Sequence, residues 1–154
     1  MSAGSDLADP FDLQRFLLAQ EEVFETALRE LERGRKESHW MWFIFPQIDG
    51  LGSSVTAKRY AIKSKEEALA YLEEPLLRDR LHRSAQALLR VEGKSALQIM
   101  GLPDDLKLRS SMTLFGSVLG GETVFREVIQ KYFGGIMDEK TLAILGKQRT
   151  CHLE

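Results

Sequence analysis

The residues best suited to chemistry lie in one short stretch, residues 38–52, which we call the Trp-rich segment. It contains Ser38, His39, Trp40, Trp42 and Gln47, and it ends in Gly50-Leu51-Gly52. An indole ring can stack on a planar ligand and donate a hydrogen bond, and glycines let backbone amides approach a ligand closely. His39 is a candidate general acid or base because imidazole titrates near neutral pH. Tryptophan is also a normal core residue, so a purely structural interpretation of this segment stays open.

A second stretch, residues 107–113, gathers cationic and hydroxyl side chains within a predicted helix. This hydroxyl-rich segment contains Lys107, Arg109, Ser110, Ser111 and Thr113. Such side chains can donate hydrogen bonds to phosphate or carboxylate oxygens. Equally, the hydroxyls could bond back to helix carbonyls on a solvated polar face. Both segments place polar groups where the helical pattern expects apolar ones, so we expect them to meet around one concave site.

Several familiar sites are excluded. The chain has no glycine-rich loop ending in Lys-Ser/Thr, and Gly50-Leu51-Gly52 lacks the third glycine of a dinucleotide fingerprint. His39, His82 and His152 are far apart, which argues against zinc. Cys151 has no partner cysteine for a disulfide. No cofactor and no metal site is therefore predicted.

Composition indicates a single globular domain. The chain has 154 residues, of which 44% are hydrophobic and 29% charged, and its net charge is -2. These values are ordinary for folded soluble proteins and argue against a nucleic-acid-binding protein, which usually carries a basic excess. The N-terminus lacks the pattern of a signal peptide and no apolar run could span a bilayer. We expect a cytoplasmic domain over residues 9–150, no membrane partner, and a flexible tail over residues 1–8.

Helical spacing predicts the elements that position the two segments. Asp9-Pro10 opens a helical stretch that ends at Gly34, with a break near residues 19–21 left open. The aromatic run at residues 40–45 is either a short buried strand or a buried helical turn. Start and stop residues predict further helices near residues 55–61, 64–72, 75–89, 95–100, 103–119 and 124–133, and from Asp138. The predicted fold class is all-α, an irregular orthogonal bundle of about seven helices.

Two motifs resemble those of a known family. A small bacterial family, catalogued only as a domain of unknown function, has signatures similar to GRKESHWMWFIFPQ (residues 34–47) and KLRSSMTLF (residues 107–115). The resemblance covers about residues 9–146, and members are often labelled "calpastatin". The composition predicts a folded core, unlike the disordered repeats of calpastatin inhibitors. The resemblance implies a helical fold and a bacterial cytoplasmic setting.

A second similarity concerns the first helical stretch. Arg15-Phe16 and Ala19-Gln20 are similar to a helix of N-glycosidases that act on ribosylated compounds. Those enzymes carry a Glu-His pair where this chain has Gln14-Arg15. The carboxylate that would stabilise an oxocarbenium-like transition state must therefore come from elsewhere, such as Asp12, or the activity is absent.

These observations predict a pocket for a polar small molecule that is nucleotide-like, ribosylated or phosphorylated. Whether the protein also hydrolyses this molecule is an open question. Arg15 and Lys107 would bind anionic groups, and His39 and Asp12 are the candidate catalytic residues. The expected ligand-binding residues are Arg15, Gln20, Ser38, Trp40, Trp42, Gln47, Lys107, Ser110, Ser111 and Thr113. Because Gln20 falls on an apolar helix face, we expect it to be buried and hydrogen-bonded. The alternative is a non-catalytic protein-interaction module.

Overall fold

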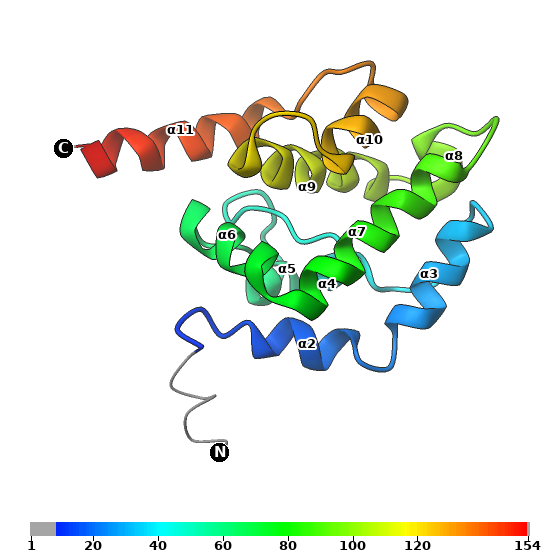
Figure 1. The fold of residues 1–154 in the computed structure, drawn as a ribbon, viewed down its shortest axis with the longest axis horizontal. Coiled ribbons are helices and arrows are strands. Elements are labelled where there is room, and N and C mark those ends of the chain that lie inside the picture. Colours follow the sequence, from blue (N-terminus) through cyan, green and yellow to red (C-terminus); the bar gives the residue numbers. More distant parts are fainter. Residues whose placement is uncertain (1–8, 154) are drawn as a thin grey trace.

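The computed structural model describes residues 9–153, and the side chains of residues 9–148. The described part is helical, as predicted (Figure 1). Its elements are α2 (Gln14–Gln20), α3 (Phe24–Glu32), α4 (Met41–Ile44), α5 (Val55–Tyr60), α6 (Lys65–Glu73), α7 (Pro75–Arg90), α8 (Ala96–Met100), α9 (Asp104–Leu119), α10 (Val124–Phe133) and α11 (Glu139–Leu153). Over these residues, no helix has both the length and the apolar character that a bilayer crossing requires. The predicted tail at residues 1–8 and the Cys151 side chain lie outside the described residues.

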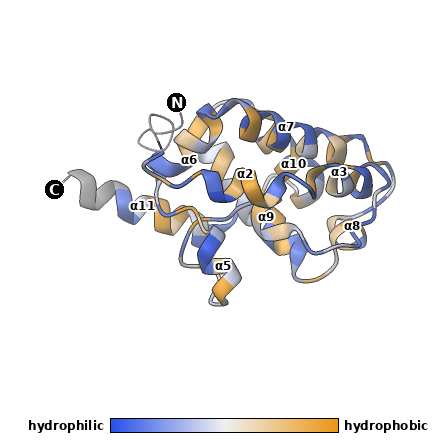
Figure 2. Cartoon of the chain, turned by 90° about the horizontal axis from the view of Figure 1, so that it is seen from below, coloured by the Kyte–Doolittle hydropathy of each residue, from blue (hydrophilic) through white to orange (hydrophobic). Residues whose placement is uncertain are grey.

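Helix α7 is central to the fold and packs against α2, α3, α4, α6 and α10 (Figure 1). The Glu74 carboxylate caps its first turn and Pro75 occupies the first helical position. One face buries Leu77, Leu81 and Leu88, whereas the opposite face is polar. The hydropathy colouring in Figure 2 shows this division along α7. Burial of such an apolar stripe is what fixes a helix in a bundle.

The number of helices is larger than predicted: ten are described, against the expected seven or so. The first helical stretch is broken after Gln20, which separates α2 from α3. The Asp9 carboxylate accepts hydrogen bonds from the N–H groups of Leu13 and Gln14, so helix α2 begins at Gln14 and not at Pro10. The aromatic run forms the helical turn α4, which resolves the choice between strand and turn.

Local capping signals place several helix starts correctly. The Ser64 hydroxyl caps α6 by accepting from the Glu67 N–H at 3.1 Å. Ser95 and Gln98 form a reciprocal capping box on α8. Ser64 and Glu67 form no such reciprocal box, because the Glu67 carboxylate accepts from the Lys63 N–H and the Arg15 guanidinium. Glu67 therefore connects α6 to α2, which a local pattern does not reveal.

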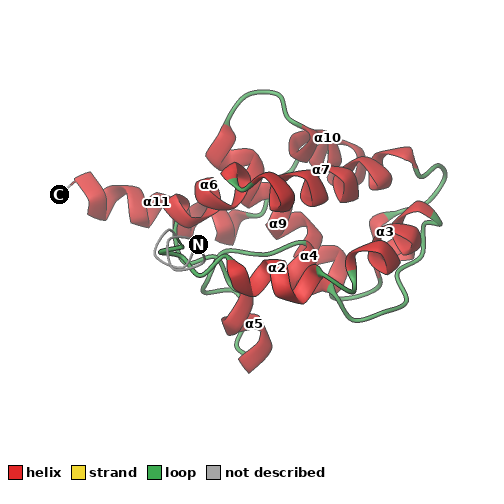
Figure 3. Ribbon diagram, turned by 60° about the horizontal axis from the view of Figure 1, so that its bottom comes forward, coloured by secondary structure: helices red, strands yellow, loops and turns green. Residues whose placement is uncertain are grey.

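Residues 50–61, here called the 50–61 loop, leave the body of the protein and return to nearly the same point. The Asp49 N–H donates to the Ile62 carbonyl and the Ile62 N–H donates to the Gln47 carbonyl, both at 2.8 Å. Ile48 and Ile62 form an isolated parallel bridge there. Helix α5 lies within this loop and projects from the body (Figure 3). Compact excursions with joined ends are frequently functional in proteins.

Candidate functional site

A buried carboxylate on α3 holds the chain that leads into the Trp-rich segment. Glu30 is 3% exposed. It accepts hydrogen bonds from the Glu37 and Ser38 N–H groups, from the Ser38 hydroxyl, and from the Trp40 indole N–H at 2.8 Å. These bonds bend the chain so that the Trp40 ring enters the core. Trp40 is fully buried. The side-chain donors of Ser38 and Trp40 are therefore both hydrogen-bonded to Glu30 within the protein.

The same contacts determine the charge of Glu30. Burial alone would raise the pKa of its carboxyl group. The hydrogen bonds from the Ser38 hydroxyl, the Glu37 N–H, the Trp40 indole and the Ser38 N–H outweigh burial and lower the pKa to about 2. Glu30 is consequently ionised at neutral pH and serves as a fixed anchor.

The Trp-rich and hydroxyl-rich segments meet at the start of α9. The ammonium group of Lys36 lies 2.9 Å from the Asp104 carboxylate and also donates to the Ser38 carbonyl. The Lys107 ammonium group lies over the Trp42 ring, 5.7 Å from its centre. It is 3.9 Å from Asp104, on the oxygen that does not contact Lys36. The two segments are thus close together at Trp42 and Lys107, although no residue of the hydroxyl-rich segment lines the hollow described next.

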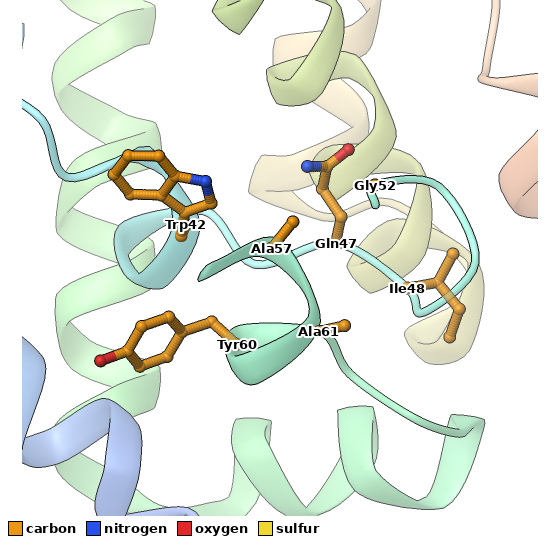
Figure 4. A pocket seen from close by; sticks show the side chains of 7 residues that line it. All are labelled: Trp42, Gln47, Ile48, Gly52, Ala57, Tyr60 and Ala61. Atoms are coloured by element: carbon orange, nitrogen blue, oxygen red, sulfur yellow. The ribbon is translucent and has the colours of Figure 1, made fainter. Parts of the chain in front are cut away.

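Trp42 lines a small hollow between the body of the protein and the 50–61 loop (Figure 4). The other lining residues are Gln47, Ile48, Gly52, Ala57, Tyr60 and Ala61. In Figure 4 the nitrogen-bearing edge of the Trp42 ring faces the Gln47 amide, with Ala57 between them, and the Tyr60 ring points away. The cavity volume of the hollow is about 20 Å³, and it is about 270 Å³ when the open solvent at its mouth is included. The smaller volume holds about one water molecule.

Two polar groups that face this hollow are not used inside the protein. The Trp42 indole N–H and the Gln47 side-chain amide make no hydrogen bond to any described residue, although neither side chain is fully exposed. Together they can offer donors and an acceptor to a molecule in the hollow. The positive charge of Lys107 lies over the Trp42 ring, although Lys107 does not itself line the hollow.

Arg15 is fully engaged in internal contacts and so has a structural task in place of the expected anion binding. Its Nε donates to the Arg59 carbonyl, and Nη1 donates to the Phe11 and Asp12 carbonyls. Nη2 donates to the Ala61 carbonyl and to Glu67, at 2.9 and 2.7 Å. All five N–H donors of a guanidinium group therefore have partners, and none is left for a ligand.

Gln20 is 1% exposed and hydrogen-bonded, as its position on an apolar helix face predicts. Its amide nitrogen donates to the Phe43 carbonyl at 2.7 Å and to the Tyr71 hydroxyl at 3.0 Å. Its amide oxygen accepts from Arg80 at 3.2 Å. Burial raises the pKa of Tyr71, which keeps its hydroxyl neutral in this network. Gln20 therefore joins α2, α4, α6 and α7 and has no free group for a ligand.

Most of the hydroxyl-rich segment anchors α11. The Asp138 carboxylate accepts from Ser110 and from the N–H and hydroxyl of Thr141, and the Asp138 N–H donates to the Thr113 hydroxyl at 2.9 Å. Ser110 and Thr113 also donate to carbonyls one turn back. Ser111 is fully buried, and its hydroxyl has no hydrogen-bond partner among the described residues.

The two candidate catalytic residues lie at the surface. His39 is exposed, one residue before the buried Trp40. Asp12 is exposed and has a φ of +54°, and it is the one described non-glycine residue with a positive φ. Tyr60, through a hydrogen bond and its charge, and to a smaller extent Asp12, through its charge, raise the pKa of Arg59. Asp12 thus lies near the C-terminal end of α5, whereas no contact joins His39 to the hollow.

The sequence patterns missed two carboxylates that shape this region, and one contact of a glycine. Glu30 and Glu67 are buried carboxylates; the only signal for Glu30 was its place beside the apolar face of α3. Gly52 was expected near a ligand, but it contacts Ala57: a Cβ built on Gly52 would lie 2.7 Å from the Ala57 Cβ. That contact narrows the hollow, and no pattern in the sequence pairs these two residues.

Comparison with known proteins yields a family and a related structure. A family model described as "Protein of unknown function (DUF1810)" matches residues 10–145. The crystal structure of the conserved hypothetical protein Rv1873 from Mycobacterium tuberculosis is 51% identical in sequence and has a TM-score of 0.88. The match covers 90% of this chain and 99% of that chain. No match was found among curated proteins. The match to the family model over most of the chain shows that this protein belongs to the DUF1810 family.

Proposed function

We propose that the hollow between Trp42, Gln47 and the 50–61 loop is the binding site for a polar small molecule that is ribosylated or phosphorylated. The observation that carries this proposal is a contrast among the polar residues of the two segments. Arg15, Gln20, Ser38, Trp40, Ser110 and Thr113 bond within the protein. Trp42 and Gln47 have no such bonds to described residues and face the same hollow. Free polar groups that converge on a concavity are typical of ligand sites.

Lys107 is the group that would bind the anionic part of the ligand. Its side chain is 30% exposed, and its distance of 3.9 Å to Asp104 is at the limit of an ion pair. The other oxygen of Asp104 already contacts Lys36 at 2.9 Å. A phosphate next to Lys107 would gain a charge-assisted hydrogen bond without breaking a close contact.

Hydrolysis of an N-glycosidic bond is a second candidate function, which the conformation of Asp12 favours. Its φ of +54° is uncommon outside glycine, and such conformations cluster at functional sites. The two carbonyls that accept from Arg15 hold the backbone in this turn. In this function Asp12 would stabilise positive charge on the sugar, and His39 would be the acid or base. A test is release of free base from ADP-ribose or NAD, measured with the wild type, Asp12→Asn and His39→Ala.

The binding proposal is tested by thermal-shift screening against nucleotides, ADP-ribose and NAD. A ligand at 100 times its dissociation constant adds about 2.7 kcal/mol to stability. Ala57→Leu places extra atoms in the hollow, and Thr56→Leu, on the exposed side of α5, is the matched control. We expect Thr56→Leu to retain the ligand-induced shift and Ala57→Leu to lose it.

A second pair of variants tests the anion contact. Lys107→Gln removes the charge beside Trp42, whereas Lys140→Gln removes an exposed charge on α11. Only Lys107→Gln should weaken binding of a phosphorylated ligand. If no compound stabilises the protein, or if Ala57→Leu keeps the full shift, the pocket is not the site. The non-catalytic interaction module is then the better description.

A further inference from the structure

We infer that residues 52–57, which we call the loop tip, form a lid that opens to admit a ligand between Trp42 and Gln47. This inference rests on the proposed function in one respect, namely that the opening serves to admit a ligand. The hinge and the movement follow from how the 50–61 loop is attached. Its attachments are uneven along its length, and the loop tip is the weakly held part.

The C-terminal end of the 50–61 loop is firmly attached. Arg15 donates to the Arg59 carbonyl at 2.8 Å and to the Ala61 carbonyl at 2.9 Å. The Tyr60 ring packs against Phe16 and Phe43, with ring centres 5.9 and 5.4 Å apart. The base of the loop is fixed by the two hydrogen bonds between residues 47–49 and Ile62. These contacts leave residues 59–61 little freedom to move.

The loop tip has no comparable attachment. Its hydrogen bonds to described residues stay within the loop, such as those that Ser54 accepts from the N–H groups of Ala57 and Lys58. Residues 52–56 are all exposed, Ala57 is half-buried, and Val55 is 85% exposed. Few buried contacts are the mark of segments that open at low cost. Outward movement of the tip would break no hydrogen bond between the tip and the described residues of the body.

A hinge precedes the loop tip. Gly50 has a φ of +110°, a conformation that other residues rarely adopt, and it follows the fixed Asp49. Gly52 lies against Ala57 at the mouth of the hollow. The tip can therefore turn about Gly50 if the first turn of α5 (Val55–Tyr60) unwinds, while residues 59–61 stay attached to Arg15.

Binding of a small molecule in the hollow would require such a movement. The cavity volume of about 20 Å³ holds about one water molecule, whereas pockets for small ligands measure about 300–1,000 Å³. Trp42, Gln47 and Ile48 belong to the body, and Gly52 and Ala57 belong to the opposite wall. Moving that wall outward enlarges the space and exposes the indole N–H of Trp42.

Acrylamide quenching of tryptophan fluorescence in the ligand-free, full-length chain tests the lid. Trp40 is fully buried, so quenching above its low background reports Trp42. Gly52→Ala adds a Cβ that would lie 2.7 Å from the Ala57 Cβ, a distance that forces a shift. Ser53→Ala, at the next exposed position, is the matched control. For a lid we expect Gly52→Ala to raise quenching clearly above the wild type with a small loss in melting temperature, and Ser53→Ala to change neither.

Two outcomes would overturn the inference. If Gly52→Ala lowers the melting temperature and leaves quenching unchanged, the tip is rigid. If the rise in quenching persists when Trp42→Phe is combined with Gly52→Ala, Trp40 has become accessible and the whole fold has loosened. Because no ligand is used, failure of the ligand screen leaves the lid result intact. Conversely, a ligand that binds to a protein with a rigid tip contradicts the lid and not the proposed function.

Discussion

The Lys107 ammonium group lies 5.7 Å from the centre of the Trp42 ring, and this contact joins the two signature segments of the chain. A cation over an indole face is a favourable arrangement, and here it places a positive charge over a ring that lines the hollow. Asp104 links Lys107 to Lys36, since its two carboxylate oxygens contact them at 3.9 and 2.9 Å. The charge over the Trp42 ring is therefore held by a small network at the start of α9.

Substitution of Lys107 should affect ligand binding and spare folding, in contrast to a core substitution. Leu88 is fully buried on α7, so Leu88→Ala should cost about 2–5 kcal/mol through lost burial and a cavity. For a chain of this size that corresponds to a fall in melting temperature of roughly 4–20 °C. Lys107→Ala and His39→Ala should change stability by only about 0.5 kcal/mol. Differential scanning calorimetry of the three variants measures this; equal losses in all three would make Lys107 and His39 structural residues.

Glu30 should make the fold sensitive to acid. Its pKa is about 2 in the folded protein, against an ordinary value of 4.5. A lowered pKa stabilises the fold fully above pH 4.5, and the contribution, about 3 kcal/mol, is lost as the pH falls from 4.5 toward 2. Glu30→Gln should therefore be less stable at pH 7 and lose less stability over that interval. Urea denaturation at several pH values measures the slope. If the free energy of unfolding depends on pH in the same way in Glu30→Gln and in the wild type, Glu30 is not the source of the acid sensitivity.

Arg15→Lys should be strongly destabilising, although it conserves the charge. Lysine has three donors and arginine five, so the change leaves buried carbonyls unpaired and weakens the contact to Glu67, which is 2% exposed. We expect a loss of about 2–3 kcal/mol in the free energy of unfolding. Arg29→Lys, at an exposed position of α3, should stay close to the wild type in the same denaturant titration. If Arg15→Lys changes the free energy of unfolding little, the internal contacts of Arg15 are weak and its guanidinium group is available to bind an anionic ligand.

Asp138→Ala should loosen both α11 and the 50–61 loop. Asp138 accepts three hydrogen bonds from Ser110 and Thr141, and α11 carries Ile144, whose Cδ1 would lie 3.2 Å from a Cβ built on Gly50. Loss of such a cap costs about 0.5–2 kcal/mol. Hydrogen exchange should become faster over residues 139–148 and over residues 49–52. Asp138→Asn retains an acceptor, so its amide hydrogens should exchange more slowly than those of Asp138→Ala. If exchange near Gly50 is identical in the wild type and in Asp138→Ala, the stability of the loop does not depend on α11.

The helices were predictable where their signals are local. Ser64, Ser95 and Asp138 cap helices through groups three residues away, so the pattern and its structural effect lie in the same few residues. Glu30 was not predictable, because its partners lie seven to ten positions later and reach it only after the chain turns back. The all-α class follows from local signals such as helix caps. The details of the site depend on contacts between residues that are farther apart in the sequence.

The two tryptophans illustrate why the site was only partly predictable. In a strand, residues two apart share a face, whereas in a helical turn they point in nearly opposite directions. The sequence left both conformations open, and the turn at α4 separates the two rings. Trp40 enters the core beside Glu30 and Trp42 reaches the hollow. Both were expected at the ligand, but the geometry leaves only Trp42 available.

The joined base of the 50–61 loop has a consequence for how this family can diversify. Because Asp49 and Ile62 are already hydrogen-bonded to each other, the length of chain between them can change at little cost in closure entropy. Insertions or replacements near Ser53 and Ser54 would alter one wall of the hollow while α7 and its neighbours keep their packing. The loop is thus a place where relatives can differ in length and composition on an unchanged helical scaffold, and where a foreign peptide could be inserted without refolding the core.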